Sequence, residues 1–389
     1  MQRSVLRVDV HQHLWPEALI DALRRRNRPP RLDGWTLHTE YEAPFEIRPT
    51  DHDPAVRSRL DPDIDLILLS LSTPLGIEEL PPEEAAELLD AWHGGVADAA
   101  HRYGYWAATT HLEPDLDALR DRLQRPEVVG LQISATWMRD PAALTGVLAT
   151  LALCEELGRP VLVHPGPAHR TPEHRAPAVP SWWPAMVDYP TQMQAAWWAF
   201  RAAGRVELPE LRICFAAGAG LAPAHHERFA VRSGQPFVVD PLVFVETSSY
   251  RRQGVDALVR ALGIDTVVLG SDRPYAHPVD PHLGEAAWHA ISVTNPRRLL
   301  GGHALPHPHV PGHRRGAPVA TRPDAGFRPG WPTHQDGRTA STTDVTAYPV
   351  HLAHPEGHRA LGHPPDPLPG DRTPTQAPPA SAQPKGVSP

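Results

Sequence analysis

The chain has 389 residues, a length that allows two domains or one barrel of about 250 residues with additions. It is 41% hydrophobic with a formal net charge of -8, so neither nucleic acid nor an anionic membrane is expected as a partner. No apolar run approaches the roughly 18 residues of a membrane span, and residues 1–4 leave no room for a signal peptide before the first predicted strand. We therefore expect a cytoplasmic protein.

Two scarce residue types exclude several kinds of chemistry. The only cysteines, Cys154 and Cys214, lie in apolar segments, as buried free thiols of a reducing compartment do. The only lysine is Lys385, close to the C-terminus. Any mechanism that needs a Schiff-base, phosphate-loop or carbamylated lysine is therefore excluded for the chain before that residue.

The first predicted strand, residues 5–10, is rich in β-branched residues and leads into His11 and His13. Because side chains alternate along a strand, both imidazoles point to one face, with Cα atoms about 6.6 Å apart. Two imidazoles at that spacing can reach one metal ion. A polar strand end that frays into a loop is the alternative for this pair taken alone.

Strands and helices alternate from there to about residue 302. A predicted helix, 16–27, is followed by a Pro- and charge-rich insertion, 29–61, in which residues 35–41 predict a small hairpin outside the main sheet. The other predicted strands are 65–71, 106–110, 128–134, 161–164, 211–217, 243–248 and 266–272. The other predicted helices are 82–103, 115–123, 141–157, 191–203, 223–232, 255–262, 283–292 and 296–300.

Eight near-continuous apolar strands between helices predict a parallel sheet covered by helices. A doubly wound open sheet also fits this alternation. We favour an α/β fold, a (β/α)8 TIM barrel over residues 1–302 with a small insertion after the first strand. The reason is that polar residues end the first, fifth and eighth strands, which only a closed sheet brings together. Residues 303–389 are rich in Pro, His, Gly and Thr without apolar periodicity, and we expect a disordered C-terminal tail.

Metal-ligating residue types close these three strands. His11 and His13 end the first, His164 ends the fifth and Asp272 ends the eighth. In a barrel all strand C-termini face one mouth, where active sites are built. Three neutral imidazoles and a carboxylate suit a divalent ion, with Zn preferred and Mn or Fe as alternatives, and leave a position for water of lowered pKa.

Four segments together resemble the amidohydrolase superfamily, in particular the amidohydrolase-related family that includes aminocarboxymuconate-semialdehyde decarboxylase. These segments are residues 8–13, 161–166, 270–274 and 294–301. The resemblance covers roughly residues 5–302. It implies a mononuclear metal centre whose ligands are His11, His13, His164 and Asp272. The binuclear branch bridges two ions through a lysine on the fourth strand, where this chain has Gln132 and Ser134.

One position departs from the family pattern. Family members usually end the sixth strand with a histidine that serves as acid/base or orients the water, and Ala217 stands there. Alanine can neither move a proton nor polarise a carbonyl. Three accounts compete: His225 or His226 reaches back from the next helix, Asp272 is both ligand and base, or the centre binds metal without turnover. A surface position on the helix is the alternative for both histidines.

Tryptophans just after strand ends are expected to wall a pocket over the metal, with core packing as the rival explanation. They are Trp15, Trp137, Trp182 and Trp183. Basic side chains near the same ends are candidates to hold an anionic group of the substrate. They are Arg273, Arg170, His169 and Arg48.

From these features we predict a metal-dependent hydrolase of the amidohydrolase type, in which metal-bound water attacks a C–N or C–O bond of a small anionic substrate. The alternative is a non-oxidative decarboxylase of an unsaturated or aromatic acid, ranked second because decarboxylating relatives rely on the sixth-strand histidine. A non-catalytic barrel is a third possibility, motivated by Ala217. The expected partner is a small-molecule substrate, with no nucleic acid or membrane, and a homodimer is left open.

Overall fold

The computed structural model describes residues 6–99, 103–168, 180 and 182–302. The predicted tail, 303–389, lies outside the described residues, as do His169 and Arg170. The domain boundary at residue 302 therefore stays a prediction. No helix in the described ranges is both long and apolar enough to cross a lipid bilayer.

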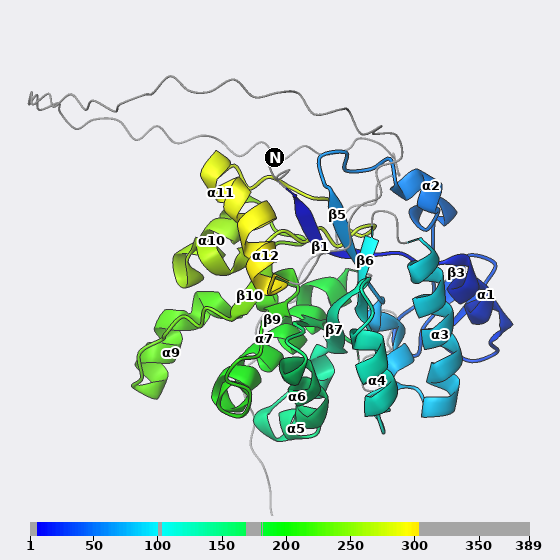
Figure 1. Cartoon of the computed structure of the whole chain (residues 1–389), viewed down its shortest axis with the longest axis horizontal. Coiled ribbons are helices and arrows are strands. Elements are labelled where there is room, and N and C mark those ends of the chain that lie inside the picture. The colour runs from blue at the N-terminus through cyan, green and yellow to red at the C-terminus, as the bar shows by residue number, and fades with distance from the viewer. Residues whose placement is uncertain (1–5, 100–102, 169–179, 181, 303–389) are drawn as a thin grey trace, which may run out of the picture. The chain divides into compact units, whose positions relative to one another are not determined.

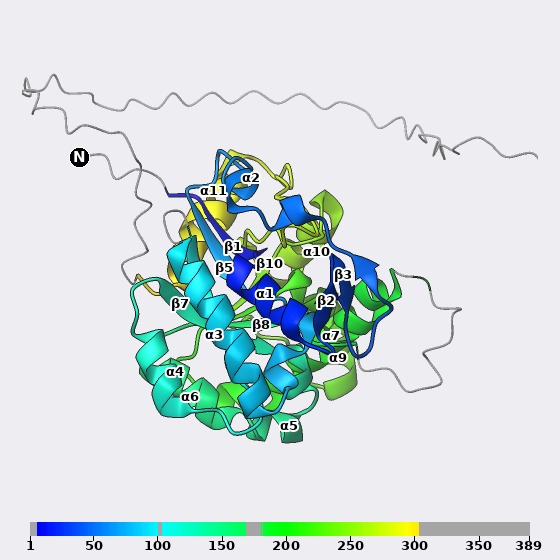
Figure 2. The same ribbon diagram turned by 90° about the vertical axis from the view of Figure 1, so that its right-hand side faces the viewer.

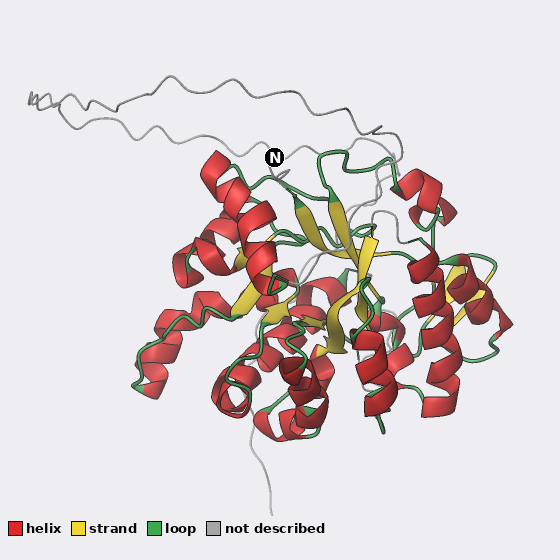
Figure 3. Ribbon diagram, viewed as in Figure 1, coloured by secondary structure: helices red, strands yellow, loops and turns green. Residues whose placement is uncertain are grey.

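Eight parallel strands form one sheet whose spatial order is the chain order. They are β1 (Val8–His13), β5 (Leu66–Ser70), β6 (Tyr103–Ala107), β7 (Val128–Ser134), β8 (Val161–His164), β9 (Ile213–Phe215), β10 (Val243–Glu246) and β11 (Val267–Val268). The sheet closes because Val10 N donates to Leu269 O at 2.8 Å and Gln12 bridges to Arg273. Helices surround these strands (Figures 1 and 3), which confirms the predicted (β/α)8 barrel.

The helices outside the insertion alternate with the strands. They are α1 (Glu17–Arg25), α3 (Pro82–Asp98), α4 (Leu116–Leu123), α5 (Pro141–Thr145), α6 (Leu148–Glu156), α7 (Tyr189–Ala199), α8 (Arg205–Glu207), α9 (His226–Ser233), α10 (Arg252–Leu262), α11 (Glu285–His289) and α12 (Asn295–Leu299). Asp115 and Asp140 begin α4 and α5, because each carboxylate accepts a hydrogen bond from a backbone N–H three residues later.

Several predicted boundaries differ from the structure, among them β9, which ends at Phe215, and β11, which covers Val267–Val268. The predicted helix 141–157 is two helices, since Val147 leaves helical geometry with φ -110° and ψ 1°. The third strand begins at Tyr103, earlier than predicted, and the preceding helix ends at Asp98. Gly104 within this strand hides its apolar pattern, although Tyr105 is buried in the sheet.

The insertion forms a separate antiparallel sheet of three strands, one more than the predicted hairpin. Its elements are β2 (Arg31–Asp33), β3 (Thr36–His38), β4 (Phe45–Glu46) and the short helix α2 (Pro54–Arg57). Figure 2 shows β2 and β3 beside α1, apart from the barrel strands. Arg57 is buried, and its guanidinium donates to His13 O and to Gln12 Oε1, each at 2.7 Å. The insertion thus supports the end of β1.

The two cysteines are free and buried, as expected. Burial raises the pKa of both thiols above the ordinary value, so neither is a ready nucleophile.

Candidate metal centre

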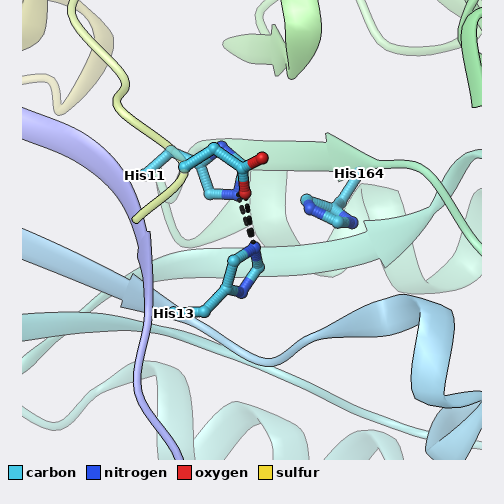
Figure 4. Close-up of side chains that lie close together, drawn as sticks. His11, His13 and His164 are labelled. Atoms are coloured by element: carbon cyan, nitrogen blue, oxygen red, sulfur yellow. Dashed lines mark hydrogen bonds and ion pairs between the residues drawn. The ribbon is translucent and has the colours of Figure 1, made fainter. Parts of the chain in front are cut away.

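Four side chains meet at the carboxyl ends of β1, β8 and β11. One ligand atom each of His11, His13, His164 and Asp272 lies within 4.8 Å of the others. His11 Nε2 and His13 Nε2 are 3.2 Å apart, and Asp272 Oδ1 lies 3.0 Å from His13 Nε2 (Figure 4). The barrel therefore brings together all four residues that the sequence singles out as ligands.

In each of the three imidazoles the outer nitrogen, Nδ1, already has a hydrogen-bond partner. His13 Nδ1 lies 3.0 Å from Ser70 O, and His164 Nδ1 lies 2.8 Å from Pro165 O. A carbonyl oxygen only accepts hydrogen bonds, so both Nδ1 atoms carry the proton and both Nε2 atoms keep a lone pair. His11 Nδ1 lies 3.3 Å from the Glu246 carboxylate, which likewise only accepts when ionised. All three rings can thus hold the tautomer that a metal ligand on Nε2 requires.

Burial keeps two of these imidazoles neutral. It lowers the pKa of His13, and it lowers the pKa of His164 well below the ordinary value. For His11, burial also opposes the charge, but the hydrogen bond and the charge of Glu246 outweigh it and the pKa is raised. Neutral imidazoles are the form that binds metal.

Asp9 ties the ligands of β1 to the loop that carries Asp272. Its Oδ1 accepts from the backbone N–H groups of His11 and Ser271, each at 3.1 Å, and its Oδ2 accepts from Gln12 Nε2 at 2.8 Å. Burial raises the pKa of Asp9 to about 6. Asp272 N also donates to His11 O at 2.9 Å, so the two ligand segments are joined directly as well.

This donor set fits a divalent cation. His11 Nε2 and His13 Nε2 face each other at 3.2 Å with a carboxylate oxygen beside them. Lone pairs gathered at such distances repel one another, and a cation among them removes the repulsion. Three imidazole nitrogens and one carboxylate oxygen are ligand types that Zn, Mn and Fe accept.

The sixth-strand region leads away from this cluster. Residues 217–221 all have φ between 46° and 61°, which makes a left-handed run of backbone. Beyond it, the His226 ring lies 5.9 Å from that of Phe237, and His225 lines a surface pocket with Trp198. Both imidazoles therefore lie with an aromatic group around α7 and α9, and the structure does not place either with the four ligands.

The predicted substrate residues fall in several surroundings. Trp15 is fully buried, stacks on His52 and donates from Nε1 to Ser72 Oγ at 2.9 Å. These contacts fit the core-packing alternative, and its place in a pocket wall stays a prediction. The Arg273 guanidinium makes two bonds to Asp61, which neutralises the charge expected to hold an anion. Trp182 is 56% exposed and lies beside Trp183. The exposed guanidinium of Arg48 pairs with Asp51.

Trp137 is the predicted tryptophan that lines a cavity. This cavity, about 600 Å3, is lined by residues from the segments that follow β5, β6, β7 and β8. His111, which sequence reasoning missed, stacks on Trp137 with ring centroids 4.8 Å apart and planes 12° from parallel. Gln192, also missed, accepts from Gly166 N and donates to Pro167 O, both at 2.8 Å, and so holds the loop that follows His164. The signal for His111 is its place just beyond a predicted strand end.

Two tyrosines near the ligands were also missed. The Tyr275 ring lies 5.6 Å from that of His13, and Tyr189 Oη donates to Glu42 Oε1 at 2.6 Å. Burial first, and then the charges of Glu42 and Asp272, hold the pKa of Tyr189 well above the ordinary value. Its phenol therefore stays protonated at neutral pH.

A sequence model described as Amidohydrolase matches residues 8–302. No curated protein sequence matches the chain. Among solved structures, Metarhizium anisopliae IDCase in apo form is 17% identical, with a TM-score of 0.63, and the match covers 77% of this chain and 97% of that one. 5-Carboxyvanillate decarboxylase LigW from Sphingomonas paucimobilis is 16% identical, with a TM-score of 0.55 and coverages of 77% and 99%.

Dihydroxybenzoic acid decarboxylase from Polaromonas sp. JS666, with bound manganese and the inhibitor 2-nitroresorcinol, is 15% identical. Its TM-score is 0.56, and the match covers 78% of this chain and 99% of that one. At these identities the likeness concerns the fold.

Proposed function

The chain belongs to the amidohydrolase family, and we propose that it is a metal-dependent carboxy-lyase, which removes the carboxylate of a small aromatic or unsaturated acid without oxidation. The observation that carries the proposal is the convergence of His11, His13, His164 and Asp272 on one point at the barrel mouth. Two of the structurally similar proteins are named as decarboxylases of aromatic acids, which moves this reaction ahead of the hydrolysis that the sequence favours.

A divalent ion held by these four residues would polarise a substrate oxygen and lower the pKa of a bound water. In decarboxylation the bond between the carboxyl carbon and its neighbour breaks, CO2 leaves, and the electron pair on the neighbour takes up a proton. We assign to Asp272 the role of holding and delivering that proton; the support is that Oδ1 faces the imidazoles while 22% of the side chain is exposed.

Other residues suit a flat, polar substrate. The stacked pair of His111 and Trp137 forms a planar wall in the neighbouring cavity. The Tyr189 phenol is held by Glu42 near Asp272 and remains a neutral hydrogen-bonding group. An aromatic acid with a ring hydroxyl group matches these features.

Hydrolysis of a C–N or C–O bond is the second candidate. Ala217 favours it, because the imidazole on which decarboxylating relatives rely is missing from the sixth strand. Asp272 would then accept the proton of the attacking water.

We also propose one tightly bound divalent ion per chain. The absence of lysine before Lys385 removes the group that bridges two ions in the binuclear branch. The ligand set of nitrogen and oxygen suits zinc, whereas manganese is present in a structurally similar protein. Metal analysis of purified protein would identify the ion and its stoichiometry, and two tight ions per chain would contradict the proposal.

The reaction is tested by incubating protein loaded separately with Mn2+ and Zn2+ with hydroxybenzoates and unsaturated acids, and with lactones and amides. We expect CO2 and the decarboxylated product from at least one acid. Asp272→Asn should lower kcat by about 10²–10⁴-fold, with a smaller loss of metal. Turnover of lactones or amides alone would favour hydrolysis, and loaded protein without turnover of any compound would favour a non-catalytic barrel.

A further inference from the structure

We propose that Glu246 is the positioning carboxylate of the metal centre: it fixes the orientation and tautomer of His11 and supplies a second negative charge for the cation. This inference rests on the metal site of the proposed function, and it holds for either reaction. Glu246 ends β10, in the wall of the barrel opposite the loops of the substrate cavity, and nothing in the sequence pattern points to it.

Four hydrogen-bond donors surround this fully buried carboxylate. Oε1 lies 2.5 Å from Ala217 N, 2.6 Å from Ser248 Oγ and 3.3 Å from His11 Nδ1, and Oε2 accepts from Ser248 N. Three of these contacts are made to Oε1 and one to Oε2, so both carboxylate oxygens are engaged. A carboxylate that accepts from several donors on different segments is held in one orientation.

The backbone nearby is shaped around this anion. A Cβ at Gly270 would overlap Glu246 Oε2, so the strand that leads to Asp272 passes the carboxylate without a side chain. Ala217 has φ 46°, in the left-handed region, and in that conformation its N–H is directed at Glu246 Oε1. The sixth-strand position that lacks an imidazole thus contributes its amide to the metal centre instead.

His11 is the ligand whose outer nitrogen meets a carboxylate, whereas Ser70 O and Pro165 O serve His13 and His164. A carboxylate behind a ligating histidine fixes its ring and increases its basicity, and removing such a partner typically costs 10- to 100-fold in metal affinity. Together with Asp272, Glu246 would also balance the two positive charges of the ion.

The test is a Co2+ titration of metal-free, full-length protein, followed by the d–d absorption of bound cobalt and by competition with a chelator. Glu246→Gln should weaken binding about 10- to 100-fold and alter the spectrum, because an amide nitrogen would face the donors of Ala217 and Ser248. The matched control is Glu78→Gln, which removes another fully buried carboxylate that contacts Gln132 rather than a ligand. It should leave affinity and spectrum unchanged.

Two further variants keep the test informative if Glu246→Gln does not fold, as judged by circular dichroism. Glu246→Asp keeps a carboxylate but shortens the side chain by one methylene, which moves it away from His11. Gly270→Ala adds a Cβ that would overlap Glu246 Oε2 and displace the carboxylate. Both variants should weaken Co2+ binding several-fold. Wild-type affinity and spectrum in the folded variants would overturn the role of Glu246 and leave the proposed enzyme standing. A wild-type protein that binds no Co2+ would overturn both proposals.

Discussion

Glu246 and Glu78 are both fully buried in one barrel, yet their surroundings differ. Glu246 accepts hydrogen bonds from four donors behind His11. Glu78 lies next to Glu79 of the cavity wall, where its Oε1 accepts from Gln132 Nε2 at 3.2 Å and its Oε2 has no partner among the described residues. Burial raises the pKa of Glu78 to about 8. Two carboxylates with the same burial thus differ in how many hydrogen-bond donors surround them.

This contrast separates two regions of the barrel mouth. The metal side holds the four ligands and Glu246, and the cavity side holds Glu78, Gln132 and the stacked pair of His111 and Trp137. On the metal side, the outer nitrogens of the three imidazoles all have partners, so the ligands are arranged before any ion arrives. On the cavity side, Gln132 Oε1 and Trp137 Nε1 lack partners within the described ranges. Unsatisfied buried groups there leave hydrogen bonds for a proton, a water or a ligand to complete.

The largest effect should come from removing a ligand on the metal side. His13→Ala deletes one of four protein ligands, so metal affinity should fall by more than the 10- to 100-fold that an outer partner contributes. The measurement is metal content after dialysis against a weak chelator, with Glu78→Gln as the buried-group control. Full metal content in His13→Ala would show that the ion binds elsewhere.

The ligands could be predicted from the sequence because their positions follow from topology. Once eight strands close into a barrel, residues that end the first, fifth and eighth strands must share one mouth. Their places along the chain are therefore enough to group His11, His13, His164 and Asp272. The surroundings of Trp15 could not be predicted in this way, because periodicity does not tell which side of a loop a ring packs on.

Other features depend on contacts that no local pattern encodes. The left-handed run at 217–221 includes alanine and leucine, which rarely adopt positive φ, and it carries His225 and His226 away from the ligands. Glu246 and Glu78 also contact residues far away in the sequence, Ala217 and Gln132, and no spacing along the chain indicates those contacts.

An effect of intermediate size is expected from Glu78 on the free energy of unfolding as pH changes. Glu78 keeps its proton in the folded state up to about pH 8, whereas the unfolded chain releases it near the ordinary value of 4.5. The unfolded state therefore binds fewer protons between these values, and the free energy of unfolding should fall as pH rises, by about 1.4 kcal/mol per pH unit from this group.

Glu78→Gln removes this titration and supplies an N–H donor beside Gln132. Denaturant midpoints at pH 5 and pH 8 should therefore show a smaller alkaline loss in the variant than in wild type. Equal losses in both proteins would mean that Glu78 is ionised in the folded state and that its burial does not hold the proton.

The smallest effect should come from Trp137→Phe on the cavity side. Trp137 is 2% exposed and its Nε1 has no partner in the part of the chain that the structure describes. Phenylalanine keeps a ring to stack on His111 and removes the N–H, so the loss of buried area is partly offset by the loss of an unsatisfied donor. Stability should change by no more than about 1 kcal/mol.

The same variant also tests substrate binding. If the substrate accepts the hydrogen bond of Trp137 Nε1, KM should rise about 3- to 10-fold with kcat retained, since a neutral hydrogen bond contributes roughly 0.5–1.5 kcal/mol. A loss of several kcal/mol in stability with unchanged KM would show instead that Nε1 serves the fold rather than the substrate.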